Sequence, residues 1–145
     1  METGKAINRL SNRLRRRSET IQASIGVSGA MGGILNYILV ESEQRHVYQV
    51  DVEKEFGLRP STATEALRKL EIKGLIERIT DPQYARRKQI VFTQKAQDIE
   101  ELLRQEITQS EELLLQNISE EEKAVFLDIA ERMLRNLDGN KEGRQ

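Results

Sequence analysis

Residues 60–74, PSTATEALRKLEIKG, carry polar side chains that could bind nucleic acid. At helical spacing Ala63, Leu67 and Leu70 form an apolar stripe with Ala66 beside it, and this stripe should face a core. The opposite face then carries hydroxyl, carboxylate and cationic groups, which can hydrogen bond to base edges and phosphates. The candidate DNA contacts on this helix and just before it are Arg59, Ser61, Thr62, Thr64, Glu65, Arg68 and Lys69.

The start of this helix suits a phosphate, and its middle suits a base pair. Pro60 fits the first helical position, where no N–H donor is needed, and the free N–H groups there attract an anion. Farther along, Arg68 would favour guanine, and Glu65 could accept a hydrogen bond from cytosine. A carboxylate near phosphates is also repulsive, so Glu65 either rejects wrong sequences or pairs with Arg68 three residues later. The alternative for the whole face is an ordinary solvated helix surface.

A second group of cations lies in residues 81–88, DPQYARRK, between two short apolar segments at 75–80 and 88–93. Two apolar segments joined by a short polar loop predict a β-hairpin. A narrow minor groove concentrates negative potential and attracts an inserted arginine. The candidate DNA contacts in this hairpin are Tyr84, which could pack on a sugar, and the cations Arg86, Arg87 and Lys88. Asp81 could pair with Arg86 across the loop, and the alternative for the cluster is a solvated basic turn.

The order of elements in residues 51–93 predicts the scaffold that positions both groups. A short helix at 51–58, a glycine turn, the helix at 60–74 and a hairpin follow one another as in a winged helix-turn-helix. Before it we expect helices at 5–23 and 28–42, the second capped by Ser28, and a brief strand at 47–50. After it we expect a long helix that is capped by Thr93 and broken at 117–118. A last helix should start at a Ser119–Glu122 capping box and run through Leu137.

The outer helices carry regular apolar stripes. In the first helix the stripe is Ile7, Leu10, Leu14 and Ile21, and in the second it is Met31, Ile34, Leu35 and Ile38. Gly32 and Gly33 weaken the second helix by roughly 1 kcal/mol each relative to alanine, so a close helix–helix contact there would explain them. The chain offers no second core for the outer helices, and a second copy of the chain is the economical cover. We therefore expect a homodimer joined through its terminal helices, with the basic first helix facing the acidic last one.

Charge and composition narrow the function. The net charge of −1 combines +3 over residues 1–50 and +3 over 51–95 with −7 over 96–145. A DNA-binding protein can be acidic overall if its positive charge lies where the phosphates bind, and the alternative is that the acidic end only keeps the protein soluble. The 145 residues contain no cysteine and one histidine, His46, which makes a His/Cys zinc site implausible. There is no P-loop, Rossmann glycine pattern or nucleophile elbow, so we expect neither an enzyme nor a cofactor. Without a long apolar segment, we expect a cytoplasmic protein that has no contact with a membrane.

The sequence resembles the MarR family of winged helix-turn-helix transcriptional regulators over about residues 5–137. The resemblance is carried by 26–38, 55–78 and the hairpin with its exit at 81–93, in the same order and at matching separations. It implies a mainly α (α+β) fold with dimerisation helices at 5–45 and 94–138, a winged helix at 46–93 and a flexible tail at 139–145. It also implies a homodimer on near-palindromic double-stranded DNA, and release by a small lipophilic or aromatic effector.

One residue of the hairpin matches the family pattern, and two residues depart from it. Arg86 occupies the position of the family's wing arginine, which makes it the first candidate for the minor groove. Glu65 stands where the family often has a basic residue, and Tyr84 stands where it commonly has an acid that locks the hairpin. Met31 and Leu35 are the candidate effector contacts, with plain core packing as the alternative.

Two hypotheses about function therefore follow from the sequence. The first is a sequence-specific DNA-binding regulator, in particular a repressor. The second is a winged-helix protein-interaction module, such as an anti-repressor or assembly subunit, that does not bind DNA. The second hypothesis is supported by three features: Glu65, the missing wing acid and the acidic total charge.

Overall fold

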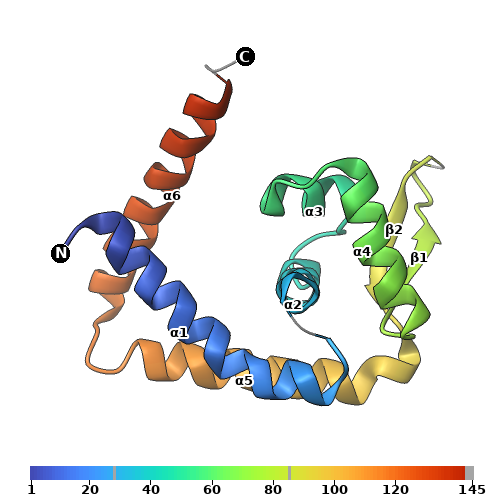
Figure 1. Cartoon of the computed structure of the whole chain (residues 1–145), viewed down its shortest axis with the longest axis horizontal. Helices are drawn as coiled ribbons and strands as arrows, with labels where there is room; N and C mark the ends of the chain where they lie inside the picture. Colours follow the sequence, from blue (N-terminus) through green and yellow to red (C-terminus); the bar gives the residue numbers. More distant parts are fainter. Residues whose placement is uncertain (28, 85, 143–145) are drawn as a thin grey trace. The chain divides into compact units, whose positions relative to one another are not determined.

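The computed structural model describes residues 1–27, 29–84 and 86–142, and it divides into two compact units, Met1–Thr108 and Gln109–Gln145. The chain is mainly helical with a small antiparallel sheet, which confirms the predicted fold class (Figure 1). Its elements are α1 (Thr3–Ser24), α2 (Ala30–Ser42), α3 (Gln49–Phe56), α4 (Pro60–Ile72), β1 (Ile76–Thr80), β2 (Lys88–Phe92), the 3-10 turn η1 (Gln94–Ala96), α5 (Gln97–Leu114) and α6 (Glu120–Glu142). None of the described helices combines the length and the hydropathy that crossing a bilayer requires.

The core of the first unit is built around α2. Ile34, Leu35 and Ile38 of this helix are buried, as the apolar stripe predicts. The inward face of α4 packs into the same cluster through Leu67 and Leu70. The sheet pairs Ile76 of β1 with Phe92 of β2, and Thr80 with Lys88. Its residues Ile76 and Ile90 belong to the same buried cluster. This shared core fixes α4 and the hairpin to one scaffold.

At the glycines of α2, where a close helix–helix contact was expected, the neighbour is a side chain of α1. The buried Gln22 side chain of α1 lies against Gly32, where an added Cβ atom would stand 2.2 Å from Gln22 Oε1. Gly33 is less confined, because a Cβ atom there would meet Phe56 Cε1 at 3.5 Å, an ordinary contact distance. Gly32 therefore makes room for the end of the Gln22 side chain. Ser28, the expected cap of α2, lies outside the described residues.

Two local predictions are corrected. Residues 47–50 form no strand: Tyr48 makes a single β-bridge to Gln89, and α3 already begins at Gln49. Thr93 does not cap a helix with its side chain, because its hydroxyl donates instead to the Gly74 carbonyl oxygen at 2.6 Å. That hydrogen bond ties the exit of β2 to the end of α4, and η1 then leads into α5.

The apolar stripe of α1 is buried only in part. Leu14 and Ile21 are half-buried, but Ile7 is 49% exposed and Leu10 is 44% exposed. The first half of α1 thus stays largely uncovered, which agrees with the expectation that the chain has no second core for its outer helices. This exposed half remains available to a second chain.

In the second unit, the break and the restart of the helix follow the prediction. Asn117 adopts the left-handed conformation with φ 62°. Ser119 N–H donates to Glu122 Oε1 at 2.9 Å, and Glu122 N–H donates to Ser119 Oγ at 3.1 Å, which is the reciprocal capping box. α6 continues to Glu142, so the helix extends past Leu137 and residues 139–142 are helical.

Candidate nucleic-acid interface

The outer edge of α4 is exposed and polar. Arg59 precedes the helix in an extended conformation, and Pro60 occupies its first turn. Every side chain that the spacing assigned to this edge is exposed: Arg59, Ser61, Thr62, Thr64, Glu65, Arg68 and Lys69. Glu65 and Arg68 are not among the ion pairs of the described residues. The carboxylate therefore stands on the same surface as the cations without neutralising Arg68.

Among the contacts of the described residues, Thr64 is the one member of this edge whose hydroxyl is already engaged by the fold. It donates to the Pro60 carbonyl oxygen at 2.8 Å and accepts a hydrogen bond from Gln49 Nε2 at 2.9 Å. The donor of Thr64 is thus used within the protein, although its place on the helix predicted a contact with a base edge. Gln49, which no sequence pattern indicated, joins the start of α3 to the start of α4.

Gln49 also reaches the sheet through Arg78. Its side-chain oxygen accepts a hydrogen bond from Arg78 Nη1 at 3.2 Å. Arg78 Nε lies 2.9 Å from Glu71 Oε1, yet this nitrogen has no partner of hydrogen-bond geometry. We regard the pair as an ion pair rather than an aligned hydrogen bond, since the distance is short and only the angle fails. Arg78 is therefore partly neutralised, and it braces α3 against β1.

The hairpin presents cations at its tip and at its exit. Arg86, Arg87 and Lys88 are exposed, and Tyr84 is 57% exposed. The turn is closed by backbone hydrogen bonds from Asp81 N–H to the Arg87 oxygen at 3.1 Å and from Arg87 N–H to the Tyr84 oxygen at 2.9 Å. The guanidinium carbon of Arg87 lies 5.5 Å from the ring centroid of Tyr48 and 5.4 Å from that of Tyr84, within cation–π range.

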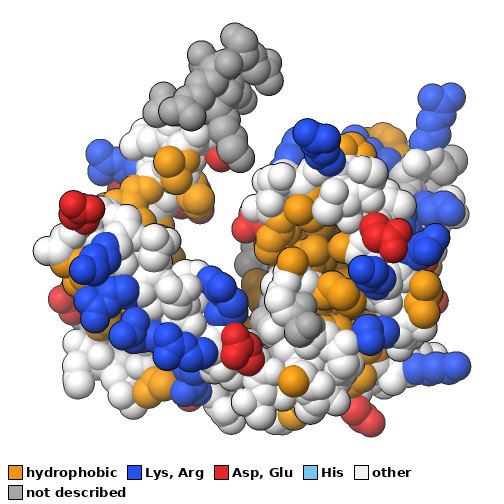
Figure 2. Space-filling view, in the orientation of Figure 1, with side chains coloured by type: hydrophobic (Ala, Val, Ile, Leu, Met, Phe, Trp, Pro, Cys, Tyr) orange, Lys and Arg blue, Asp and Glu red, His pale blue; other side chains and the backbone are white. Residues whose placement is uncertain are grey.

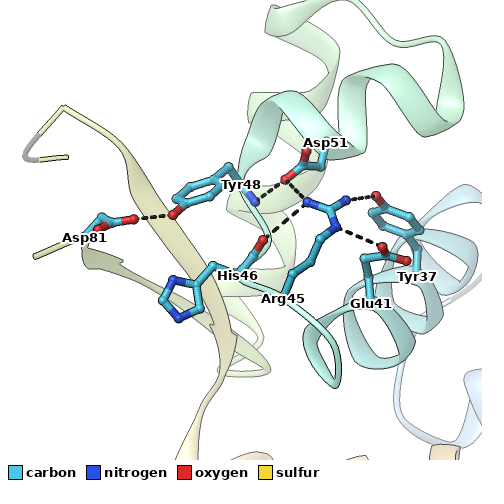
Figure 3. Close-up of polar contacts among 7 residues, drawn as sticks. All are labelled: Tyr37, Glu41, Arg45, His46, Tyr48, Asp51 and Asp81. Carbon is cyan, nitrogen blue, oxygen red and sulfur yellow. Dashed lines mark hydrogen bonds and ion pairs between the residues drawn. The ribbon is translucent and has the colours of Figure 1, made fainter. Parts of the chain in front are cut away.

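Asp81 has a different partner from the one expected. Its carboxylate accepts the Tyr48 hydroxyl (Figure 3). It also accepts the Gln83 N–H at 2.8 Å, and the residue is almost fully buried. The cross-loop pair with Arg86 is not among the ion pairs of the described residues. The physical reason is that Asp81 points inward at the base of the hairpin. The Tyr48 hydroxyl lowers the pKa of Asp81 and the carboxylate raises the pKa of Tyr48, because the bond favours the charged acid and the neutral phenol.

A second polar cluster fixes the segment that leads into α3 (Figure 3). The Arg45 side chain donates to Glu41 at 2.9 Å and to the Tyr37 hydroxyl at 3.2 Å, and it lies 3.1 Å from the Asp51 carboxylate. Asp51 in turn accepts the Tyr48 N–H at 2.8 Å. The hydrogen bond to Glu41 is the main cause of the raised pKa of Arg45. The side chain of His46, beside Arg45, is exposed.

An open cationic hollow lies between the start of α3 and the hairpin. It has a volume of about 420 Å³. Its lining residues are Tyr48, Gln49, Val50, Arg78, Arg86, Arg87 and Lys88. Figure 2 shows lysine and arginine side chains projecting around the winged helix in this view, with hydrophobic side chains between them. Four cations around one hollow favour a polyanion such as a nucleic-acid backbone.

A separate hollow of about 520 Å³ lies in the first unit beside α1 and α2. Its lining residues are Ser11, Leu14, Arg15, Ser18, Gln22, Gly29, Ala30, Gly33, Asn36 and Phe56. Asn36 Oδ1 is buried there without a hydrogen-bond partner. The effector candidates are elsewhere: Leu35 belongs to the buried core, and Met31 packs against that core.

Residues 42–88 match the model of the MarR family. No curated protein gives a significant match. Among solved structures, MepR of S. aureus in its DNA-binding conformation matches with a TM-score of 0.82 and 25% identity, over 94% of this chain and 99% of that chain. MarR from Oenococcus oeni PSU-1 matches with a TM-score of 0.78 and 25% identity, over 92% and 99%. The S. aureus MepR–DNA complex matches with a TM-score of 0.75 and 24% identity, over 94% and 96%. These similarities confirm the fold class and the family resemblance.

Proposed function

We propose that this chain, a member of the MarR family of transcriptional regulators, binds double-stranded DNA sequence-specifically as a homodimer and represses transcription. The observation that carries the proposal is that one rigid core presents two surfaces together. These are the exposed polar edge of α4 and the cationic hairpin. Such a helix fits the major groove, and such a hairpin fits the adjacent minor groove.

Roles within the interface follow from position. The start of α4, with its Ser61 and Thr62 hydroxyls, is suited to a phosphate. Arg68 is suited to guanine in the major groove, and Arg86 to the minor groove. Arg59, Lys69, Arg87 and Lys88 add phosphate contacts, and Tyr84 adds a packing surface for sugar.

The dimer is supported by apolar side chains that a single chain leaves exposed. In α6, Phe126 is 59% exposed, Leu134 is 54% exposed and Leu137 is 68% exposed. Such side chains at helical spacing are buried economically against a second copy, as are those of the first half of α1. A two-fold dimer would place its recognition helices in successive major grooves about 34–36 Å apart, and hence on a near-palindromic operator. A monomer in sedimentation equilibrium at micromolar concentration would contradict this part of the proposal.

Release by an effector is supported by the hollow beside α1 and α2. Its volume of about 520 Å³ lies within the range of small-molecule sites. The unpartnered Asn36 Oδ1 offers an acceptor to a ligand hydroxyl or N–H group. We propose a small aromatic or lipophilic ligand that carries one such donor. A thermal-shift screen should show stabilisation by phenols that the Asn36→Leu variant loses. Stabilisation that persists in this variant would place the ligand elsewhere.

The alternative is a protein-interaction module that does not bind DNA, and one observation favours it. Glu65 is exposed and unpaired by Arg68 on the surface that would face DNA. The two readings differ in a gel-retardation assay with random duplex at low salt. A DNA-binding regulator should retard the duplex, and its affinity for the duplex should fall as the salt concentration rises. An interaction module should not retard the duplex at all.

A further inference from the structure

We propose that Tyr48 and Asp81 form a clasp that holds the hairpin in its DNA-binding position. Both are then positioning residues for the DNA contact, although neither has to touch DNA. The inference rests on the proposed function and names two residues that control it. The bond joins the segment before α3 to the first residue of the hairpin turn, thirty-three positions later.

The Asp81 carboxylate organises the turn from the inside. One oxygen, Oδ2, accepts the Tyr48 hydroxyl. The other, Oδ1, accepts Gln83 N–H at 2.8 Å and lies 3.4 Å from Tyr84 N, a weaker second contact. One buried side chain therefore ties the turn to itself and to the rest of the winged helix. Hydrogen bonds to a carboxylate are stronger than those between neutral groups, so this junction is well suited to fix the hairpin.

Tyr48 is itself held in place, so the clasp has a rigid base. Its N–H donates to Asp51 Oδ2 at 2.8 Å, and Asp51 is also contacted by Arg45 (Figure 3). Its neighbour Val47 accepts Ile90 N–H at 2.8 Å, and Tyr48 bridges Gln89. A movement of the hairpin turn away from α3 therefore has to break the hydroxyl–carboxylate bond.

The clasp also determines where the wing cations lie. The Tyr48 ring provides one face for the guanidinium of Arg87, and Tyr84 provides another. Arg86, Arg87 and Lys88 are consecutive and repel one another. Tyr84 stands where the resemblance led us to expect a locking acid, and the clasp supplies a lock from a different pair of residues.

Removal of the Asp81 charge should change the DNA affinity in the direction opposite to that of an ordinary loss of negative charge. Removing an acid from a DNA-binding surface ordinarily strengthens binding, because it removes repulsion from phosphate. If Asp81 positions the hairpin, Asp81→Asn should instead weaken binding. Glu77→Gln is the matched control: Glu77 is an exposed acid on β1, on the same hairpin, outside the clasp.

The experiment measures duplex affinity of the full chain by fluorescence anisotropy at low salt. Tyr48→Phe keeps the ring beside Arg87 and loses only the hydroxyl. We expect Tyr48→Phe and Asp81→Asn each to weaken duplex binding by about tenfold. The double variant should bind no more weakly than Asp81→Asn, because the bond is already lost. Tyr48→Phe should leave the dependence on salt unchanged. Wild-type affinity in Tyr48→Phe, or tighter binding in Asp81→Asn as in Glu77→Gln, would overturn the proposal.

Hydrogen exchange of the amides of Gln83 and Tyr84 separates this proposal from the proposed function. Both clasp variants should exchange these amides faster than the wild-type protein, while Glu77→Gln should not. If the wild-type protein ignores DNA but the amides respond in this way, the function is wrong and the clasp exists without that role. If the wild-type protein binds DNA and the amides do not respond, the clasp is refuted.

Discussion

The side-chain amide of Gln49 donates to the Thr64 hydroxyl across 2.9 Å, which joins the first turn of α3 to the first turn of α4. The same hydroxyl donates to Pro60, so a residue on the outer edge of the recognition helix has a structural task. The interface is therefore built from two kinds of residue: exposed ones free to meet DNA, and bonded ones that set the angle between the two helices.

Thr64→Val should lower the free energy of unfolding by about 1 kcal/mol, since the shape is kept and the hydrogen bonds are lost. Chemical denaturation followed by circular dichroism measures the change. Thr62→Val, an exposed threonine of the same helix, should leave the unfolding free energy nearly unchanged. Equal losses in the two variants would show that the Gln49–Thr64 bond does not contribute.

Arg68→Ala should relax discrimination at one base position of the operator, where it costs about 1–3 kcal/mol of specificity. The reason is that a guanidinium can bind both acceptors on the guanine edge. Binding of the wild-type protein and the variant to a panel of single-base operator variants tests the assignment. If both proteins rank the panel identically, Arg68 does not read a base.

Arg86→Ala should weaken binding to all DNA sequences and reduce the slope of log affinity against log salt by about one. An arginine in a minor groove acts mainly through its charge, so the loss should not depend strongly on sequence. Arg135→Ala, which removes an exposed arginine from α6, is a control of equal charge. Arg86 has no role in DNA binding if its variant behaves like this control.

The pKa shifts of the clasp predict its pH range. Tyr48 has a pKa raised above 10.0, so its contribution to stability is complete below pH 10 and is lost as the pH rises through the folded-state value. Asp81 has a pKa lowered below 3.8, so its contribution is complete above that pH and is lost as the pH falls through the folded-state value. Absorbance titration should show that Tyr48→Phe removes a tyrosine that ionises late. Loss of an early-ionising tyrosine would contradict the bond.

The winged helix was predictable from sequence because its signals are local. The stripe of Ala63, Leu67 and Leu70 fixes which face of α4 is buried, and Pro60 fixes where the helix starts. The Ser119–Glu122 capping box was predictable for the same reason, since its two hydrogen bonds lie within one turn. Helical spacing alone therefore identifies the exposed edge of α4.

The contacts that position the interface were not predictable, because they join residues far apart in the chain. Tyr48 and Asp81, like Gln49 and Arg78, meet only after the hairpin has folded back against α3. Local spacing paired Asp81 with Arg86 instead, since both lie in one loop. The sequence signalled only the local part of this contact, because a polar side chain at the start of a short turn commonly bonds the following N–H groups.

The measurement that tests the central claim most directly is an anisotropy titration of the full chain against a random duplex at increasing salt. The proposed recognition helix and cationic hairpin predict binding at low salt, with log affinity falling linearly against log salt by about 0.9 for each phosphate neutralised. No binding in dilute buffer, or an affinity that salt does not change, would contradict the assignment of this surface to DNA.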